Sequence, residues 1–179
     1  MSKTSIFDRM RSDHREVLEK IAVLDSAAGE AHGRHHGRGW PVGTVTEVLD
    51  MLERQFSTHM AAEDEILFPA LLEALPQARL SIEPLQADHV ELRTMLSRLR
   101  ETLREPAGDA RNEQIGVQLR DFVDLLRIHI RKEEAVVISV AERVLKPREV
   151  QALAARMAHP ERGESNRRPG SGPSKGARS

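Results

Sequence analysis

The sequence predicts an all-α protein, an antiparallel up-down-up-down four-helix bundle with a short C-terminal helix and a disordered tail. Aromatic residues make up only 3% of the 179 residues and Tyr is absent, whereas β-sheets are rich in aromatic and β-branched side chains. Apolar residues recur at helical spacing in four long segments, and no segment shows the pattern of a strand. The segments are joined by short connections, as in antiparallel bundles.

The first two helices are expected on either side of a glycine-rich loop. The first spans about residues 5–28, with Ser5 as a suitable N-cap. Residues 29–43 hold five glycines and a proline, which predicts a loop. The second helix is expected to begin near Thr44, which forms a capping box with Glu47.

Prolines and glycines mark the remaining boundaries. Pro69 lies inside the second apolar segment, so we expect a kink or an early end there. The third helix is expected to begin around Ser81 and to stop at Pro106. The fourth runs over about residues 112–145, with Val136 on its apolar face, and residues 148–158 form a short fifth helix.

The chain is expected to form one domain over residues 1–158, followed by a disordered basic tail over residues 159–179. The tail is polar and rich in Gly and Pro, so it buries too little apolar surface to offset its ordering entropy. The net charge of −1 provides no field that would attract nucleic acid or an anionic membrane. There is no apolar stretch of membrane-spanning length and no secretory signal, so we expect a cytoplasmic protein. The oligomeric state stays open.

The chemically informative feature is a two-part repeat of His and acidic residues. An Asp-His pair occurs in the first and third helical segments, and a His followed four residues later by a Glu occurs in the second and fourth. The pairs are Asp13 and His14, Asp88 and His89, His59 and Glu63, and His129 and Glu133. The chain therefore looks like two copies of one helix pair, packed around a common axis.

Helical phase predicts that the repeated residues converge in the core. Residues four apart share a helix face, and all four histidines fall on apolar stripes where leucine would be expected. By the same phase, Asp64, Glu65 and Glu134 should point elsewhere, either to solvent or behind the inner residues.

Four histidines and two glutamates cannot satisfy one another in a dry core, whereas a pair of cations bridged by carboxylates would keep the glutamates ionised. With no cysteine in the chain, His and carboxylate ligands favour iron or manganese, and zinc is possible. The competing interpretation is a structural bundle with hydrogen-bonded core histidines.

These motifs resemble the hemerythrin-like family, also called the HHE cation-binding domain. The likeness rests on Asp-His-x-Glu, on His-x-x-x-Glu running into Leu-Phe-Pro, on the second Asp-His pair, and on His-x-x-x-Glu-Glu, over residues 14–134. It implies a bundle with an oxo- or hydroxo-bridged pair of Fe ions. The implied terminal ligands are His14, His59, His89 and His129, and the implied bridges are Glu63 and Glu133.

Two departures separate this chain from the oxygen-carrying hemerythrins. Arg93 stands where those proteins have a further histidine, and the last carboxylate follows its histidine by four residues rather than five. Both departures resemble the bacterial HHE branch, which includes proteins linked to iron–sulfur repair and to nitric oxide or peroxide stress. The iron–sulfur repair proteins of that branch can carry an extra histidine between the first two helices, so His35 or His36 is a possible fifth ligand. Because a guanidinium cannot ligate iron, we expect Arg93 to pair with an acidic residue.

These inferences lead to a diiron protein that binds or reacts with a small ligand, O2, peroxide or NO, in the response to oxygen, nitric oxide or oxidative stress. Peroxide disproportionation is a possible enzymatic activity. The alternative is a non-catalytic iron-holding or regulatory binding module. Metal content would separate both from a purely structural bundle.

Overall fold

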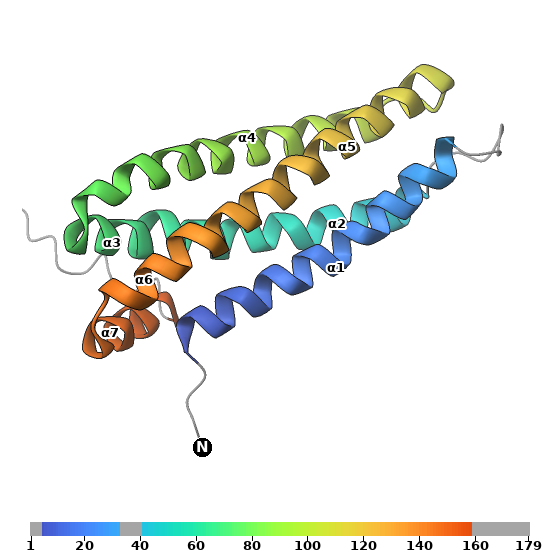
Figure 1. Ribbon diagram of the computed structural model, residues 1–179. Coiled ribbons are helices and arrows are strands. Elements are labelled where there is room, and N and C mark those ends of the chain that lie inside the picture. The colour runs from blue at the N-terminus through green and yellow to red at the C-terminus, as the bar shows by residue number, and fades with distance from the viewer. Residues whose placement is uncertain (1–4, 33–40, 159–179) are drawn as a thin grey trace, which may run out of the picture.

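Four long helical arms form the predicted all-α bundle, and no strand occurs in the part of the chain that the structure describes (Figure 1). The computed structural model describes residues 5–32 and 41–158, with side chains for residues 5–26 and 41–158. The expected tail and the candidate ligands His35 and His36 lie outside the described residues.

The arms follow one another in an up-down-up-down order. The first arm is α1, and the second arm consists of α2, two short π-helical segments and α3. A 3-10 turn leads into α4, the third arm, and the fourth arm consists of α5, a π-helical segment and α6, with α7 folded back beside it. The bounds are α1 Ile6–His32, α2 Val42–Gln55, π Phe56–Met60 and Glu63–Leu67, α3 Phe68–Ala74, 3-10 Pro76–Ala78, α4 Arg79–Arg104, α5 Asp109–Lys132, π Glu133–Ile138, α6 Ser139–Val144 and α7 Pro147–Ala158.

The arms pack as a four-sided bundle. Helix α1 contacts both α2 and α5, and α4 contacts the same two helices, so each arm lies between two neighbours. The short helix α7 closes one end of the bundle beside the start of α1 (Figure 1), and its Leu153 is buried there.

Several boundaries differ from the sequence-based expectation. Helix α1 continues to His32, into the glycine-containing segment expected to be a loop. Helix α2 begins at Val42, after Pro41, so Thr44 is not its N-cap. Its first turns are fixed by packing rather than by a cap, because Val45 is fully buried in the core. The second arm does not end at Pro69: this residue lies in the first turn of α3, where its missing N–H is tolerated.

The π-helical segments change which residues face the core. A π segment holds one more residue than an α-helix of the same pitch, so it rotates every side chain that follows it. In the fourth arm, Val136 was expected on the core face, but it is 39% exposed, while Val137 and Ile138 are buried. The expectation for Val136 was therefore wrong because it assumed an uninterrupted α-helical period.

The hydrophobic core consists of two clusters, with the His and Glu residues between them along each arm. One cluster runs from Val17 and Leu52 to Leu99 and Phe122, toward the end where α4 joins α5. The other gathers the start of α1 with α3, the first turns of α4, α6 and Leu153. The polar centre is therefore a layer across the middle of the bundle.

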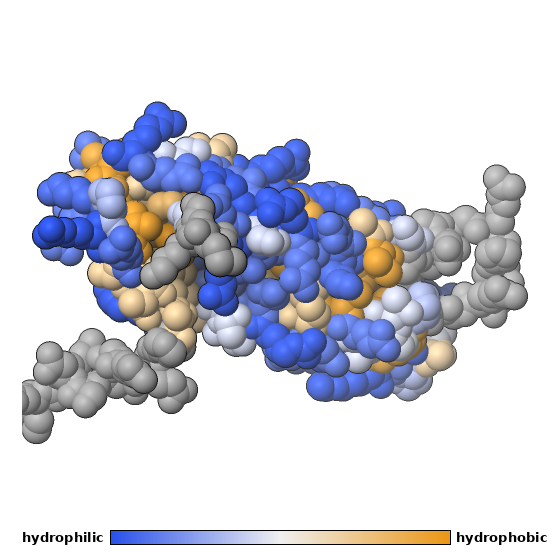
Figure 2. Space-filling view, turned by 90° about the horizontal axis from the view of Figure 1, so that it is seen from below, coloured by the Kyte–Doolittle hydropathy of each residue, from blue (hydrophilic) through white to orange (hydrophobic). Residues whose placement is uncertain are grey.

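Hydrophilic side chains cover most of the face seen in Figure 2, and its apolar residues form separate small patches. Among the described helices, none combines the length and apolar character needed to cross a membrane.

Candidate metal centre

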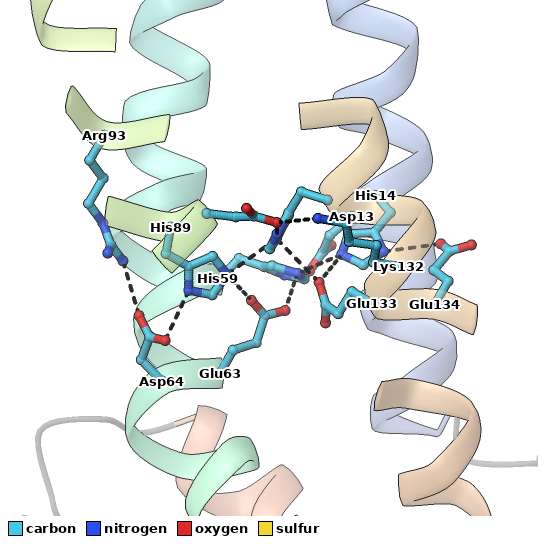
Figure 3. A network of polar contacts seen from close by, with 12 residues as sticks. Asp13, His14, His59, Glu63, Asp64, His89, Arg93, Lys132, Glu133 and Glu134 are labelled. Atoms are coloured by element: carbon cyan, nitrogen blue, oxygen red, sulfur yellow. Dashed lines mark hydrogen bonds and ion pairs between the residues drawn. The ribbon is translucent and has the colours of Figure 1, made fainter. Parts of the chain in front are cut away.

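All six predicted ligand residues meet in the polar layer at the middle of the bundle (Figure 3). Each arm contributes at least one of them. Glu63 and Glu133 are fully buried, His89 is fully buried, and His14 and His129 are nearly so. His59 is the most accessible of the four imidazoles, with a side chain that is 13% exposed. The helical-phase argument is confirmed for the placement of these side chains.

The six side chains form two groups of donor atoms. In one group, which we call site A, His14, His59, Glu63 and Glu133 each place a donor atom within 4.8 Å of the others. In the second group, site B, His89 and His129 lie within the same distance of Glu63. The two Nε2 atoms are 3.0 Å apart in site A and 3.2 Å apart in site B. Because Glu63 belongs to both groups, its carboxylate is placed to bridge them.

No described residue satisfies the buried carboxylates. The Nε2 atom of His59 approaches Oε1 of Glu63 to 2.7 Å, but none of the four oxygens of Glu63 and Glu133 accepts a well-formed hydrogen bond from a described residue. Burying an ionised carboxyl group in this way is unfavourable. A cation between the imidazoles would compensate for it, so the donor set fits a metal.

Proton affinities show how the layer is balanced without a metal. Burial and the charge of Glu133 raise the pKa of Glu63 to about 7. Burial would also raise the pKa of Glu133, but the polar contact and charge of His14 outweigh burial and lower it to about 2. Burial lowers the pKa of His59, yet the charge of Glu63 more than reverses this, so the net shift is upward. In the metal-free protein, Glu63 and His59 therefore share a tendency to bind a proton, which offsets part of the buried negative charge.

His14, His59 and His89 each have a carboxylate at the outer nitrogen, Nδ1, which leaves Nε2 pointing to the centre (Figure 3), and Asp88 lies farther from Nδ1 of His129. Such carboxylate–histidine pairs fix the ring orientation of metal ligands and raise their basicity. The four Nδ1–oxygen distances are 3.1 Å for His14 with Glu134, 3.3 Å for His59 with Asp13, 2.9 Å for His89 with Asp64 and 3.7 Å for His129 with Asp88.

These outer contacts could be predicted from the sequence only in part. Asp64 and Glu134 were placed off the inner face, as observed, and Glu65 is exposed. The roles of Asp13 and Asp88 were missed. Their signal was the repeated Asp-His pair, since a residue next to an inner ligand lies at the seam with the neighbouring helix.

The expectation for Arg93 is confirmed. Its Nη2 atom lies 3.5 Å from Oδ2 of Asp64, so the guanidinium turns away from the centre and pairs with an acidic side chain. On the fourth arm, Lys132 makes a comparable contact, with Nζ 3.2 Å from Oδ2 of Asp88.

A small cavity adjoins the centre. Its volume is about 20 Å³, and it is bordered by His14, His59 and His129, by Asp13 and Gln55, and by apolar side chains. The apolar lining residues are Val17, Phe56, Met60, Leu126 and Ile130. This volume is enough for about one water-sized molecule.

A helical bundle with buried His and Glu donors between its arms defines a class of metal-cation-binding domain. The chain matches the family model of the hemerythrin HHE cation binding domain over residues 5–141, and it belongs to that family. No curated protein matches the chain closely enough in sequence to be compared with it. The matched range contains all six candidate ligands.

Proposed function

We propose that the chain holds two iron ions at sites A and B and that this centre binds or reacts with O2, peroxide or NO. His14 and His59 would hold one ion, His89 and His129 the other, and Glu63 and Glu133 would bridge them. The observation that carries this proposal is the pair of buried carboxylates that accept no hydrogen bond from a described residue, each surrounded by imidazole nitrogens. A protein with this centre fits a role in the response to oxygen, nitric oxide or oxidative stress.

Iron bound there would supply redox chemistry and coordination positions for a small ligand. The protein's own part is to hold the imidazoles in one orientation through the carboxylates at Nδ1 and to neutralise the cations with Glu63 and Glu133. The cavity beside His14, His59 and His129 supports a diatomic-sized ligand, because half of its lining residues are apolar and it holds about one small molecule.

Metal analysis of the purified protein tests the proposal directly. We expect close to two irons per chain after Fe(II) is supplied without oxygen. Adding iron to the metal-free protein should also release protons, since the ions displace those on Glu63 and His59. A folded protein that takes up no iron under these conditions would refute the metal centre.

The reaction with small ligands is tested on the iron-loaded, reduced protein by following its optical spectrum after mixing with O2, NO or peroxide. Val17→Ile adds a methylene at the cavity wall, and we expect it to slow the spectral change while leaving the iron content unchanged. Val123→Ile is the matched control, because Val123 is buried in the same core cluster but does not line the cavity. If no ligand changes the spectrum, the non-catalytic iron-holding module is the better interpretation.

A further inference from the structure

The outer carboxylates form a closed ring around the centre. Each one sits next to an inner donor in the sequence and contacts an imidazole on the next arm along the chain, with the fourth arm returning to the first. In order, Asp13 contacts His59, Asp64 contacts His89, Asp88 contacts His129 and Glu134 contacts His14. The ring follows the internal repeat, so sites A and B would be equivalent if all four contacts were alike.

The contacts are not alike, because basic side chains share the carboxylates of site B. Oδ2 of Asp88 lies 3.2 Å from Nζ of Lys132 but 3.7 Å from Nδ1 of His129, so the ammonium has the shorter contact. Nδ1 of His129 is buried without a hydrogen-bond partner among the described residues. The other carboxylate of site B, Asp64, keeps a 2.9 Å contact between Oδ1 and Nδ1 of His89, but it shares its charge with Arg93, whose Nη2 lies 3.5 Å from Oδ2.

The carboxylates of site A have no such competitor. Within residues 5–26 and 41–158, no Lys or Arg nitrogen comes within ion-pair distance of Asp13 or Glu134, and Arg9 and Arg11 act on these two only at longer range. Their charge therefore remains directed at the imidazoles of His59 and His14. A carboxylate at Nδ1 strengthens an imidazole ligand, and a cation that shares the carboxylate weakens that effect.

The arrangement of the inner donors also favours site A over site B. Site A gathers four donor residues within 4.8 Å, whereas site B gathers three, because Glu133 is not part of its compact set. Nε2 of His14 lies 3.3 Å from Oε2 of Glu133, and Nε2 of His129 lies 3.7 Å from the same oxygen. Glu133 thus leans toward site A.

We propose that the two cation positions are inequivalent, with site A binding a divalent cation more tightly than site B, and that Arg93 and Lys132 are positioning residues that lower the affinity of site B. This inference rests on the proposed two-ion centre. The two copies of the internal repeat would then differ. Site A would hold its cation firmly, and site B would hold its cation more weakly and exchange it first.

The test is an equilibrium titration of the full-length, metal-free protein with Co2+, whose visible absorption reports its coordination. We expect two binding steps whose constants differ by about tenfold or more. Lys132→Met should tighten the second step and leave the first unchanged. Asp13→Asn should weaken the first step by about 10- to 100-fold, the usual effect of removing a carboxylate behind a metal-bound histidine. Glu134→Gln acts on the same site and replaces Asp13→Asn if that variant does not fold.

Arg104→Met is the control for the loss of a positive charge. Arg104 is an exposed residue eleven positions beyond Arg93 on α4, about 16 Å away along the helix. It should leave both steps unchanged, whereas Arg93→Met should tighten the second.

The possible outcomes separate this inference from the proposed function. Two Co2+ ions bound with equal affinity, or a Lys132→Met variant with an unchanged second step, would overturn the inequivalence and leave the two-ion centre standing. A protein that binds no Co2+ and no iron would overturn both.

Discussion

Glu63→Gln distinguishes the effect of metal binding on stability from the stability of the metal-free bundle, because it removes a buried charge and keeps the shape of the side chain. Without metal, the raised pKa of Glu63 means that folding favours its protonated form. The sign follows from linkage: this contribution is complete below the unfolded-state pKa of about 4.5 and is lost as the pH rises through about 7. Gln at this position does not titrate, so the metal-free variant should escape the loss.

A rise in the pKa from 4.5 to about 7 corresponds to at most about 3 kcal/mol at about 1.4 kcal/mol per unit, because Glu63→Gln also removes the charge that raises the pKa of His59. For a domain of this size, that free energy shifts the melting temperature by about 6–12 °C. Glu133 does not interfere in this range: its lowered pKa contributes stability above about pH 4.5, which is lost only as the pH falls toward 2.

The assay is thermal unfolding of the chelator-treated proteins at pH 5 and pH 8, followed by circular dichroism. Wild type and Glu63→Gln should melt at similar temperatures at pH 5, and the variant should melt higher at pH 8. With metal added, the order should reverse, because the variant lacks the bridging carboxylate. Glu65→Gln, an exposed neighbour on the same segment, should match wild type throughout. Parallel melting curves for wild type and Glu63→Gln at both pH values would refute the reasoning.

Three further predictions follow from burial and helical phase. Val137→Glu should destabilise the bundle by more than about 3 kcal/mol, whereas Val136→Glu should change stability by less than about 0.5 kcal/mol; equal effects in urea unfolding would contradict the π-helical phase. Phe122→Ala should cost about 3–5 kcal/mol in the same assay, since Phe122 is fully buried; a loss below 1 kcal/mol would show that the core is looser than described. Glu133→Ala should lose most of the bound iron while Glu65→Ala retains it, as measured by metal analysis; equal loss from both would show that the phase of the ligands is wrong.

The inner donors could be predicted from sequence because they obey a short-range rule. A His and a Glu four residues apart share a helix face whatever the rest of the fold does. The same rule placed His14 and His89 inside from their apolar neighbours. The π-helical segment that follows Glu133 could not be predicted in this way, since it inserts one residue without any change in composition, and Val136 was misplaced as a result.

Helix starts and outer contacts depended on tertiary packing that sequence does not display. Thr44 has the chemistry of an N-cap, but burial of Val45 in the core extends α2 backward to Val42. The contact of Asp88 with Lys132 joins α4 to the end of α5, across 44 residues of sequence. The sequence therefore shows that acidic residues stand beside the inner donors, but which imidazole each one contacts depends on how the arms pack.

The π-helical segments in the second and fourth arms also have a consequence for how this chain can vary. Each widened turn resets the rotation of the helix beyond it, so α3 and α6 present their apolar faces independently of the donors that precede them. Substitutions at the end of the bundle that α7 closes therefore need not disturb the donors. A one-residue deletion within Glu133–Ile138 would have the opposite effect. It would restore an ordinary α-helical turn, so the donors and the apolar face of α6 could no longer both point into the core.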